Sequence, residues 1–213
     1  MMTSPFRNML QIAVGVIVAA AAIHTWLVMG LVVPMTVAGS SMSPALEGPR
    51  LMFRCEACRS EFGVGLDQLI DEDRAVCPHC HQIAARRKDA NVRGDRLLVD
   101  RTAFLLRQPR RWEVVVFRSP TDAQKMFVKR IAGLPGETVS LREDGVWING
   151  QVVPRPGGES YKLRPGDRNE CRLGPAEYFV LGDNGAISDD SRSWLEGPGV
   201  DAKLLIGKAL GVR

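Results

Sequence analysis

Four of the five cysteines in this 213-residue chain stand in two pairs, each with two residues between its members. The full pattern is C-x2-C-x18-C-x2-C and comprises Cys55, Cys58, Cys77 and Cys80. Two turns of this kind can direct four thiolates at one zinc ion in a tetrahedron. The spacing therefore predicts a structural zinc ribbon. Disulfides are the alternative if the segment lies in an oxidising compartment.

The histidine content limits the nucleophilic chemistry that is open to the chain. Of three histidines, His24 lies in an apolar run, whereas His79 and His81 flank the second cysteine pair and are expected to be exposed loop residues. A Ser-His-Asp or Cys-His enzyme needs a histidine that can approach its nucleophile, so nucleophilic catalysis here must use another base. The fifth cysteine, Cys171, is accordingly expected to be a partly buried small residue rather than a nucleophile.

Lys129 is the candidate for that base. Strand alternation in residues 127–131 (FVKRI) puts Lys129 on the same face as Phe127 and Ile131. A lysine on an apolar face loses solvation, and its pKa falls toward the range in which the free amine can act as a base. The alternative is an ordinary strand lysine whose head group reaches water. By its local sequence alone, Ser41 could equally belong to a simple turn.

A long uncharged segment precedes Lys129 and the paired cysteines in the chain and includes Ser41. The net charge of +4 and the 45% hydrophobic content are those of an ordinary soluble domain. However, residues 8–46 contain no Asp, Glu, Lys or Arg, and of the charged residues only Arg7 precedes them. This distribution excludes a plain cytosolic globule. The abundance of aliphatic residues excludes a disordered or collagen-like chain.

Residues 9–33 form a predicted transmembrane helix, since they supply the roughly 20 apolar residues that a bilayer core requires. Pro34 marks the expected end of the helix. The alternative is a cleaved signal peptide, with residues 36–38 (TVA) as its cleavage site, but its apolar region should span only about 7–15 residues. Arg7 before the span favours a cytoplasmic N-terminus. No later stretch reaches spanning length, so a single-pass protein is expected.

Beyond the cysteine segment the sequence predicts short strands separated by Pro and Gly turns. The strand-like runs are residues 96–99, 113–117, 125–131, 145–153, 177–181 and 204–212. Within the fourth run, Asn149-Gly150 is typical of a two-residue hairpin turn. Several short strands with little helical periodicity predict a mainly β domain with antiparallel sheets.

Three segments, taken together, resemble the motifs of type I signal peptidases. Residues 39–46 (GSSMSPAL) are similar to the family's nucleophile box, commonly G-x-S-M-x-P-T-L, and residues 127–137 (FVKRIAGLPGE) are similar to its lysine box. Residues 182–192 (GDNGAISDDSR) are similar to its G-D-N-x-x-x-S-x-D-S-R box. The resemblance covers residues 9–48 and 91–213. It implies an antiparallel β catalytic domain of signal peptidase I type behind one transmembrane helix.

The resemblance also implies a domain organisation. The nucleophile box of the family normally runs within a few residues into G-D-x-x-L-V, a pattern that returns here only at residues 93–99. The cysteine segment is therefore predicted to be a small zinc-ribbon-like module inserted between two adjacent strands. The expected parts are a cytoplasmic N-terminus, a transmembrane helix, a β-rich peptidase domain in two pieces, and the inserted module: residues 1–8, 9–33, 34–53 with 91–213, and 54–90.

Carried over residue by residue, the resemblance implies a catalytic dyad in which Ser41 is the nucleophile and Lys129 is the general base. The oxyanion would be held by the Ser41 N–H and a neighbouring donor. Support would come from four further residues: Gly39 beside the oxyanion, Ser188 as a hydrogen-bond partner of the lysine amine, and Asp190 and Arg192 as a salt bridge. Some relatives have a serine where this chain has Gly39, which leaves the second oxyanion donor open. Catalysis of this kind uses no cofactor, so structural zinc is the only one expected.

The activity implied is that of a membrane-bound serine endopeptidase that cleaves N-terminal signal peptides from exported preproteins after small residues. The alternatives are a dedicated maturation peptidase of the same fold for one secretion system, and a non-catalytic membrane-tethered zinc-ribbon binding module. The expected partners are preprotein signal peptides, the lipid bilayer and, as a further candidate, the secretion translocon. Nucleic acid is not expected, because residues 54–90 carry 6 basic and 7 acidic side chains. The expected location is the inner (cytoplasmic) membrane, with the catalytic domain extracytoplasmic.

Overall fold

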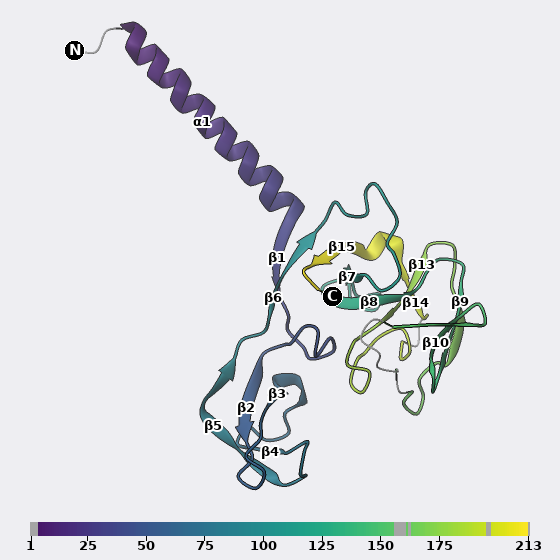
Figure 1. Cartoon of the computed structure of the whole chain (residues 1–213). Helices are drawn as coiled ribbons and strands as arrows, with labels where there is room; N and C mark the ends of the chain where they lie inside the picture. Colours follow the sequence, from purple (N-terminus) through teal and green to yellow (C-terminus); the bar gives the residue numbers. More distant parts are fainter. Residues whose placement is uncertain (1–3, 156–160, 162, 195–196, 213) are drawn as a thin grey trace.

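The computed structural model describes residues 4–155, 161, 163–194 and 197–212, and it consists of one long helix followed by antiparallel sheets (Figure 1). Helix α1 (Ser4–Leu31) projects away from the sheets, and its window Asn8–Thr25 is long and apolar enough to cross a membrane, by length and composition. The helix ends two residues before the predicted boundary at Val33. The reason is that Val32 and Val33 already pair with a neighbouring strand, as does Pro34.

The largest sheet has seven strands, and each strand is antiparallel to its neighbours. In spatial order they are β1 (Val32–Thr36), β6 (Arg96–Asp100), β15 (Leu205–Leu210), β7 (Val114–Arg118), β8 (Met126–Gly133), β13 (Glu177–Leu181) and β14 (Gly199–Asp201). Strands β7, β8 and β13 lie in the middle of this order and are largely buried. A short 3-10 helix, η2 (Ala202–Leu204), precedes β15. The predicted antiparallel, mainly β fold is confirmed.

A second sheet of four strands lies beside β13 and β14 in Figure 1. Its order is β11 (Gln151–Val153), β10 (Gly145–Ile148), β9 (Thr138–Arg142) and β12 (Glu170–Arg172). The predicted hairpin is β10–β11, and its turn residues Asn149 and Gly150 have φ of 50° and 81°, as a type I′ turn requires. Cys171 lies in β12, half-buried against the core, and burial raises the pKa of its thiol to about 11. These findings confirm its prediction as a partly buried small residue.

The third sheet carries the cysteines and stands apart from the other two in Figure 1. Its order is β3 (Glu61–Gly65), β2 (Arg50–Arg54), β5 (Ile83–Val92) and β4 (Arg74–Val76), and the 3-10 helix η1 (Leu66–Gln68) follows β3. Because β2 and β5 pair along their length, the sheet reaches from Arg50 to Val92 and is wider than the predicted insert of residues 54–90. We call residues 50–92 the cysteine module.

Candidate active site

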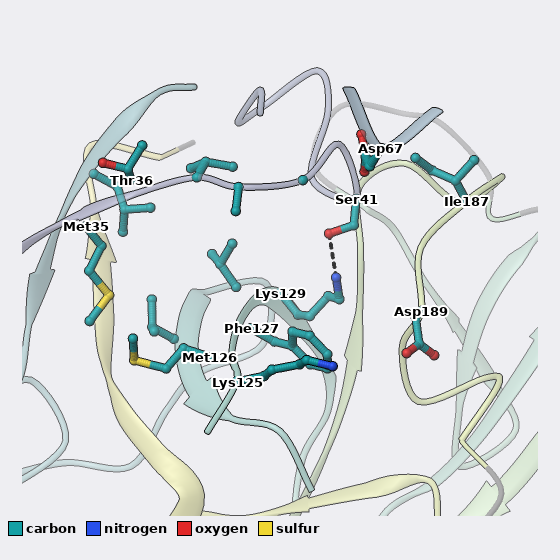
Figure 2. A pocket seen from close by; sticks show the side chains of 16 residues that line it. Met35, Thr36, Ser41, Asp67, Lys125, Met126, Phe127, Lys129, Ile187 and Asp189 are labelled. Carbon is teal, nitrogen blue, oxygen red and sulfur yellow. Dashed lines mark hydrogen bonds between the residues drawn. The ribbon is translucent and has the colours of Figure 1, made fainter. Parts of the chain in front are cut away.

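Ser41, the predicted nucleophile, lies in the loop between β1 and β2 (residues 37–49), which we call the nucleophile loop and which is anchored by the neighbours of Ser41. Met42 is completely buried in the core with strand residues of β6 and β7, and Leu46 is buried in the same cluster. The Leu46 N–H donates to the Met42 carbonyl at 2.9 Å, and the Ser43 N–H donates to the Ser40 carbonyl at 3.1 Å. The loop is therefore a closed turn with an apolar anchor, and the Ser41 side chain points away from that anchor into a cavity (Figure 2).

Lys129 meets Ser41 in this cavity, with its Nζ 2.6 Å from the Ser41 Oγ (Figure 2). The lysine lies on β8, is 3% exposed, and has its Nζ 5.5 Å from the centre of the Phe127 ring. Burial lowers the pKa of Lys129 to about 8, although the nearby Asp190 carboxylate opposes the shift. At pH 7 about one in ten of these amines is thus uncharged and able to accept a proton, far more than for an ordinary lysine.

Ser188 is completely buried near the dyad but makes a different contact from the one predicted. Its Oγ has no hydrogen-bond partner within the described residues, and the Lys129 Nζ contacts the Ser41 Oγ. A Cβ at Gly182 would collide with the Ser188 Oγ and with the Ser41 carbonyl oxygen, so only glycine lets these groups approach. Ser188 therefore packs beside the nucleophile loop, and the predicted hydrogen bond to the amine is absent.

Asn184 was missed as a site residue, although it lies in one of the quoted motifs. Its backbone N–H donates to the Ser41 carbonyl at 3.0 Å, and its own carbonyl accepts from the Ser188 N–H at 3.0 Å. The loop of residues 182–188 therefore holds the nucleophile loop through the main chain. The position of Asn184 directly after Gly-Asp in the motif could have indicated a role. However, a contact made by the backbone does not depend on the residue type, so the sequence does not predict it.

Two buried ion pairs lie under the dyad. The predicted Asp190–Arg192 pair is present at 2.8 Å with both side chains 0% exposed, and Asp190 also accepts the Gly182 N–H at 2.9 Å. The second pair, Arg130–Asp183 at 2.8 Å, was not predicted. Both arginines therefore form ion pairs with carboxylates, whereas the hydrogen-bond partner of Lys129 is the neutral hydroxyl of Ser41. This difference suits the lysine to act as a base.

The cavity around the dyad has a volume of about 680 Å³ and a mostly apolar wall. The lining residues come from β1, β6, β7, β8 and the residue before it, the nucleophile loop, the loop after β13 and one position of the cysteine module: Met35, Thr36, Val37, Ala38, Gly39, Ser41, Asp67, Leu97, Val116, Lys125, Met126, Phe127, Val128, Lys129, Ile187 and Asp189. Gly39 contributes only backbone. The Ser41 N–H has no acceptor among the residues that the structure describes, and it is therefore free to bind an oxyanion.

The four paired cysteines converge at the far end of the cysteine module. Their Sγ atoms all lie within 4.8 Å of one another, with Cys55–Cys80 at 3.4 Å and Cys58–Cys77 at 3.6 Å, and all four are free thiols. Four thiolates around a zinc ion at about 2.3 Å would be about 3.8 Å apart. His81 directly follows the second pair. With φ of 60° it forms part of the turn there, and it is not one of the four clustered ligand residues. The donor set thus fits a tetrahedral metal site.

Comparisons with known proteins relate part of this chain to signal peptidases. A family model described as signal peptidase, peptidase S26, matches residues 81–212, which include Lys129 but do not reach Ser41. A probable signal peptidase I-2 of Synechocystis sp. is 38% identical over 109 residues, covering 47% of this chain and 48% of that protein. Signal peptidase I T of Bacillus subtilis is 36% identical over 110 residues, covering 48% and 56%. The chain thus spans about half the length of the curated relatives it matches.

One solved structure is also similar, a crystal structure of a signal peptidase I from Enterococcus faecalis V583. It has a TM-score of 0.39 and 28% sequence identity, and the match covers 48% of this chain and 97% of that chain.

Proposed function

Since this chain belongs to the signal peptidase family, peptidase S26, we propose that it is a serine endopeptidase that removes N-terminal signal peptides from exported preproteins. The single observation that carries the proposal is the 2.6 Å contact between the Ser41 Oγ and a lysine amine that burial keeps partly neutral. We assign Ser41 as the nucleophile and Lys129 as the general base. The alternative of a non-catalytic binding module has no use for a buried amine beside a partly exposed hydroxyl.

The mechanism proceeds through an acyl-enzyme. Neutral Lys129 accepts the Ser41 hydroxyl proton while the Oγ attacks the scissile carbonyl carbon. The oxyanion that forms is bound by the Ser41 N–H, and one such donor typically contributes a factor of about 10²–10³ in kcat. The lysine ammonium then gives its proton to the leaving amine as the peptide bond breaks. A water molecule, deprotonated by the same amine, hydrolyses the ester and restores Ser41.

The substrate is proposed to bind as an extended peptide in the cavity beside the dyad. Met35 and Thr36 of β1 lie on one side of this cavity, and Ile187 lies on the other side, near Ser41 (Figure 2). The apolar wall beside the nucleophile favours uncharged side chains, and the family resemblance implies small ones, typically alanine, at the first and third positions before the cut. Small residues would let the scissile carbonyl approach the Ser41 Oγ.

Membrane anchoring is proposed to bring the enzyme and this substrate together. Strand β1 follows α1 without a linker, so Ser41 is ten residues from the end of the helix. We propose a single-pass protein of the inner membrane with a cytoplasmic N-terminus and, outside, a peptidase domain of residues 34–49 and 93–213 into which the cysteine module (residues 50–92) is inserted. External protease should degrade the peptidase domain of spheroplasts. Protection of that domain in intact spheroplasts would contradict the orientation.

We further propose that Cys55, Cys58, Cys77 and Cys80 hold one structural zinc ion. The bound ion would cross-link the two cysteine turns, and nothing in the peptidase chemistry is assigned to it. Elemental analysis of the purified chain should find about one zinc per molecule. Thiol counting that finds two disulfides would contradict this assignment.

The peptidase activity is tested with the full chain in detergent and a panel of preproteins. Ser41→Ala and Lys129→Ala should each abolish cleavage, whereas Lys203→Ala, an exposed lysine on η2, should cleave like the unchanged enzyme. Because the pKa of Lys129 is about 8, kcat/KM should fall about tenfold per pH unit below that value. Full activity in either dyad variant would overturn the assignment. Cleavage of one preprotein only would favour a dedicated maturation peptidase.

A further inference from the structure

One carboxylate of the cysteine module reaches the nucleophile loop. Asp67, on η1, accepts the Ser40 N–H at 2.9 Å through its Oδ2 and the Ser40 hydroxyl at 2.7 Å through its Oδ1. Ser40 directly precedes Ser41 and is 6% exposed, so its two donors are largely withdrawn from water. Figure 2 shows the Asp67 side chain close to Ser41 at the edge of the cavity. The module that carries the cysteines thus contacts the loop that carries the nucleophile.

Backbone contacts of the neighbouring residues fix the position of Asp67. The Leu66 N–H donates to the Pro49 carbonyl at 2.9 Å, which ties the start of η1 to the chain that leaves the nucleophile loop. A Cβ at Gly65 would collide with the Ser40 Oγ, so a glycine is required for η1 to approach this closely. Asp67 is therefore placed by main-chain contacts on the same short segment.

The contact bears on the peptide group that joins Ser40 to Ser41. The carbonyl of this group accepts the Ser43 N–H at 3.1 Å, and its N–H is the free donor of Ser41. On one side the group is fixed by Asp67, which binds the Ser40 N–H and hydroxyl. On the other side it is fixed by the Asn184 N–H, which binds the Ser41 carbonyl at 3.0 Å. The direction of the Ser41 N–H is thus set by the cysteine module and the seven-stranded sheet together.

We propose that Asp67 is a positioning residue for the peptidase reaction, through which the cysteine module holds the Ser41 N–H and Oγ in their reactive orientation. The inference rests on the proposed function of Ser41 and adds a role for the insert. The carboxylate acts only through Ser40. Its effect should therefore appear in kcat, because the oxyanion forms after substrate binding and misplacement by about 1 Å can reduce the rate about 10²-fold.

The kinetic test compares Asp67→Ala with Asp67→Asn and with a control, Asp73→Ala. Asp73 is an exposed aspartate of the same module, so the control removes the same negative charge from it. Asp67→Ala should lower kcat by about 10- to 100-fold with KM changed less than about threefold. Asp67→Asn should recover much of this loss, since its carbonyl oxygen can still accept the Ser40 N–H. Asp73→Ala should be unchanged. A kcat for Asp67→Ala within twofold of Asp73→Ala would overturn the proposal.

Ser40→Ala tests the same contact from the other side, in case the cysteine module fails to fold when Asp67 is replaced. This variant removes only the hydroxyl contact and should lower kcat severalfold. In its background, the further effect of Asp67→Ala should be smaller than in the unchanged enzyme, because the two residues share a hydrogen bond. Thiol counting should give the same result in every variant, which separates a lost contact from a disrupted module. Fully independent effects of the two substitutions would contradict the proposed connection.

Amide hydrogen exchange separates this inference from the peptidase assignment. In the full chain, Asp67→Ala should speed exchange in a peptide covering residues 37–46 relative to Asp73→Ala, with no cleavage needed for the readout. If Ser41→Ala abolishes cleavage while Asp67→Ala changes neither kcat nor exchange, the peptidase function stands and the positioning role falls. If the unchanged chain cleaves no preprotein but Asp67→Ala still speeds exchange in residues 37–46, the peptidase function is wrong. The structural contact by which Asp67 holds the nucleophile loop is then still supported.

Discussion

The seven-stranded sheet, which we call the peptidase sheet, and the cysteine module differ in how far their ion pairs are exposed to solvent. Beneath Ser41, the Arg192–Asp190 pair has both side chains 0% exposed. On the module, the Arg87–Glu61 pair has a nearly equal N–O distance of 2.8 Å, yet its side chains are 45% and 42% exposed. A buried pair holds its partners in fixed directions but is strongly destabilising when broken, whereas an exposed pair contributes little.

The difference follows from the size of the two cores. The seven-stranded sheet buries aromatic and aliphatic side chains on both faces, and this burial can compensate for the desolvated charges close to Lys129. The module has a small core of Leu51, Phe53 and Ala84 with the cysteines Cys55 and Cys77. Cores of this size rarely stabilise a fold alone, and a metal cross-link is a common supplement. If the proposed zinc ion is bound, the chain stabilises one region by burial and the other by metal–thiolate bonds.

Removing the metal should give the largest effect, and this effect should be limited to the cysteine module and the nucleophile loop that Asp67 contacts. Cys77→Ser or treatment with a strong chelator is expected to unfold residues 50–92, because structural zinc typically contributes about 10–16 kcal/mol to such a module. Strands β7 and β8 should keep their amide protection, since their core does not include the cysteines. Hydrogen exchange read peptide by peptide measures both. Unchanged protection of the module after metal removal would show that its own core is sufficient.

Breaking the buried pair should give the next largest effect. Asp190→Asn leaves the Arg192 guanidinium buried with less compensating charge and should lower the free energy of unfolding by about 3–5 kcal/mol. Asp190 is also the main carboxylate that raises the pKa of Lys129, so its loss should move the acid limb of the pH–rate profile to lower pH. Denaturant titration and the pH profile measure the two effects. A loss below 1 kcal/mol would place this pair with the exposed ones.

These regions also differ in how far the sequence could predict them. Strands β6, β8 and β13 were predicted because apolar side chains mark them, and the pairing of Ser41 with Lys129 followed from motif resemblance. Strand β9 was missed because its short, partly polar sequence resembles a loop. Strand β1 was missed because Pro34 suggested only a helix end, but on an edge strand proline is tolerated.

Contacts across the two regions were beyond sequence reasoning. Asp67 and Ser40 are 27 positions apart, and neither belongs to a periodic pattern that would place one opposite the other. Their meeting depends on how the module is attached, through the Leu66–Pro49 backbone contact. The Ser188 hydroxyl, which has no hydrogen-bond partner in the part of the chain that the structure describes, is a similar case, because the motif predicts a nearby serine but not the direction of its Oγ. Residue types were therefore predictable where chemistry selects them, and orientations were not.

Replacing the buried lysine should stabilise the peptidase sheet in a pH-dependent way. The pKa of Lys129 is about 8 in the folded chain against 10.5 for an ordinary lysine, so protonation opposes folding increasingly as pH falls from 10.5 to 8. Lys129→Met should therefore raise the free energy of unfolding by up to about 3 kcal/mol below pH 8 and by little above pH 10.5. Lys203→Met is the exposed control. A gain that is equal at both pH extremes would mean that the lysine folds with its usual pKa.

The smallest effect is expected from the exposed pair on the module, and it tests the comparison from the other side. Glu61→Gln should change the free energy of unfolding of the metal-loaded chain by at most about 1 kcal/mol, because solvent already screens the Arg87 guanidinium. The residual effect should disappear in 1 M salt, where the Debye length is about 3 Å. The loss in Asp190→Asn should persist there, since its charges are not reached by ions. If Glu61→Gln instead destabilises by several kcal/mol at high salt, the module depends on its surface ion pairs as well as on its thiolates. The contrast between the two regions would then be one of degree.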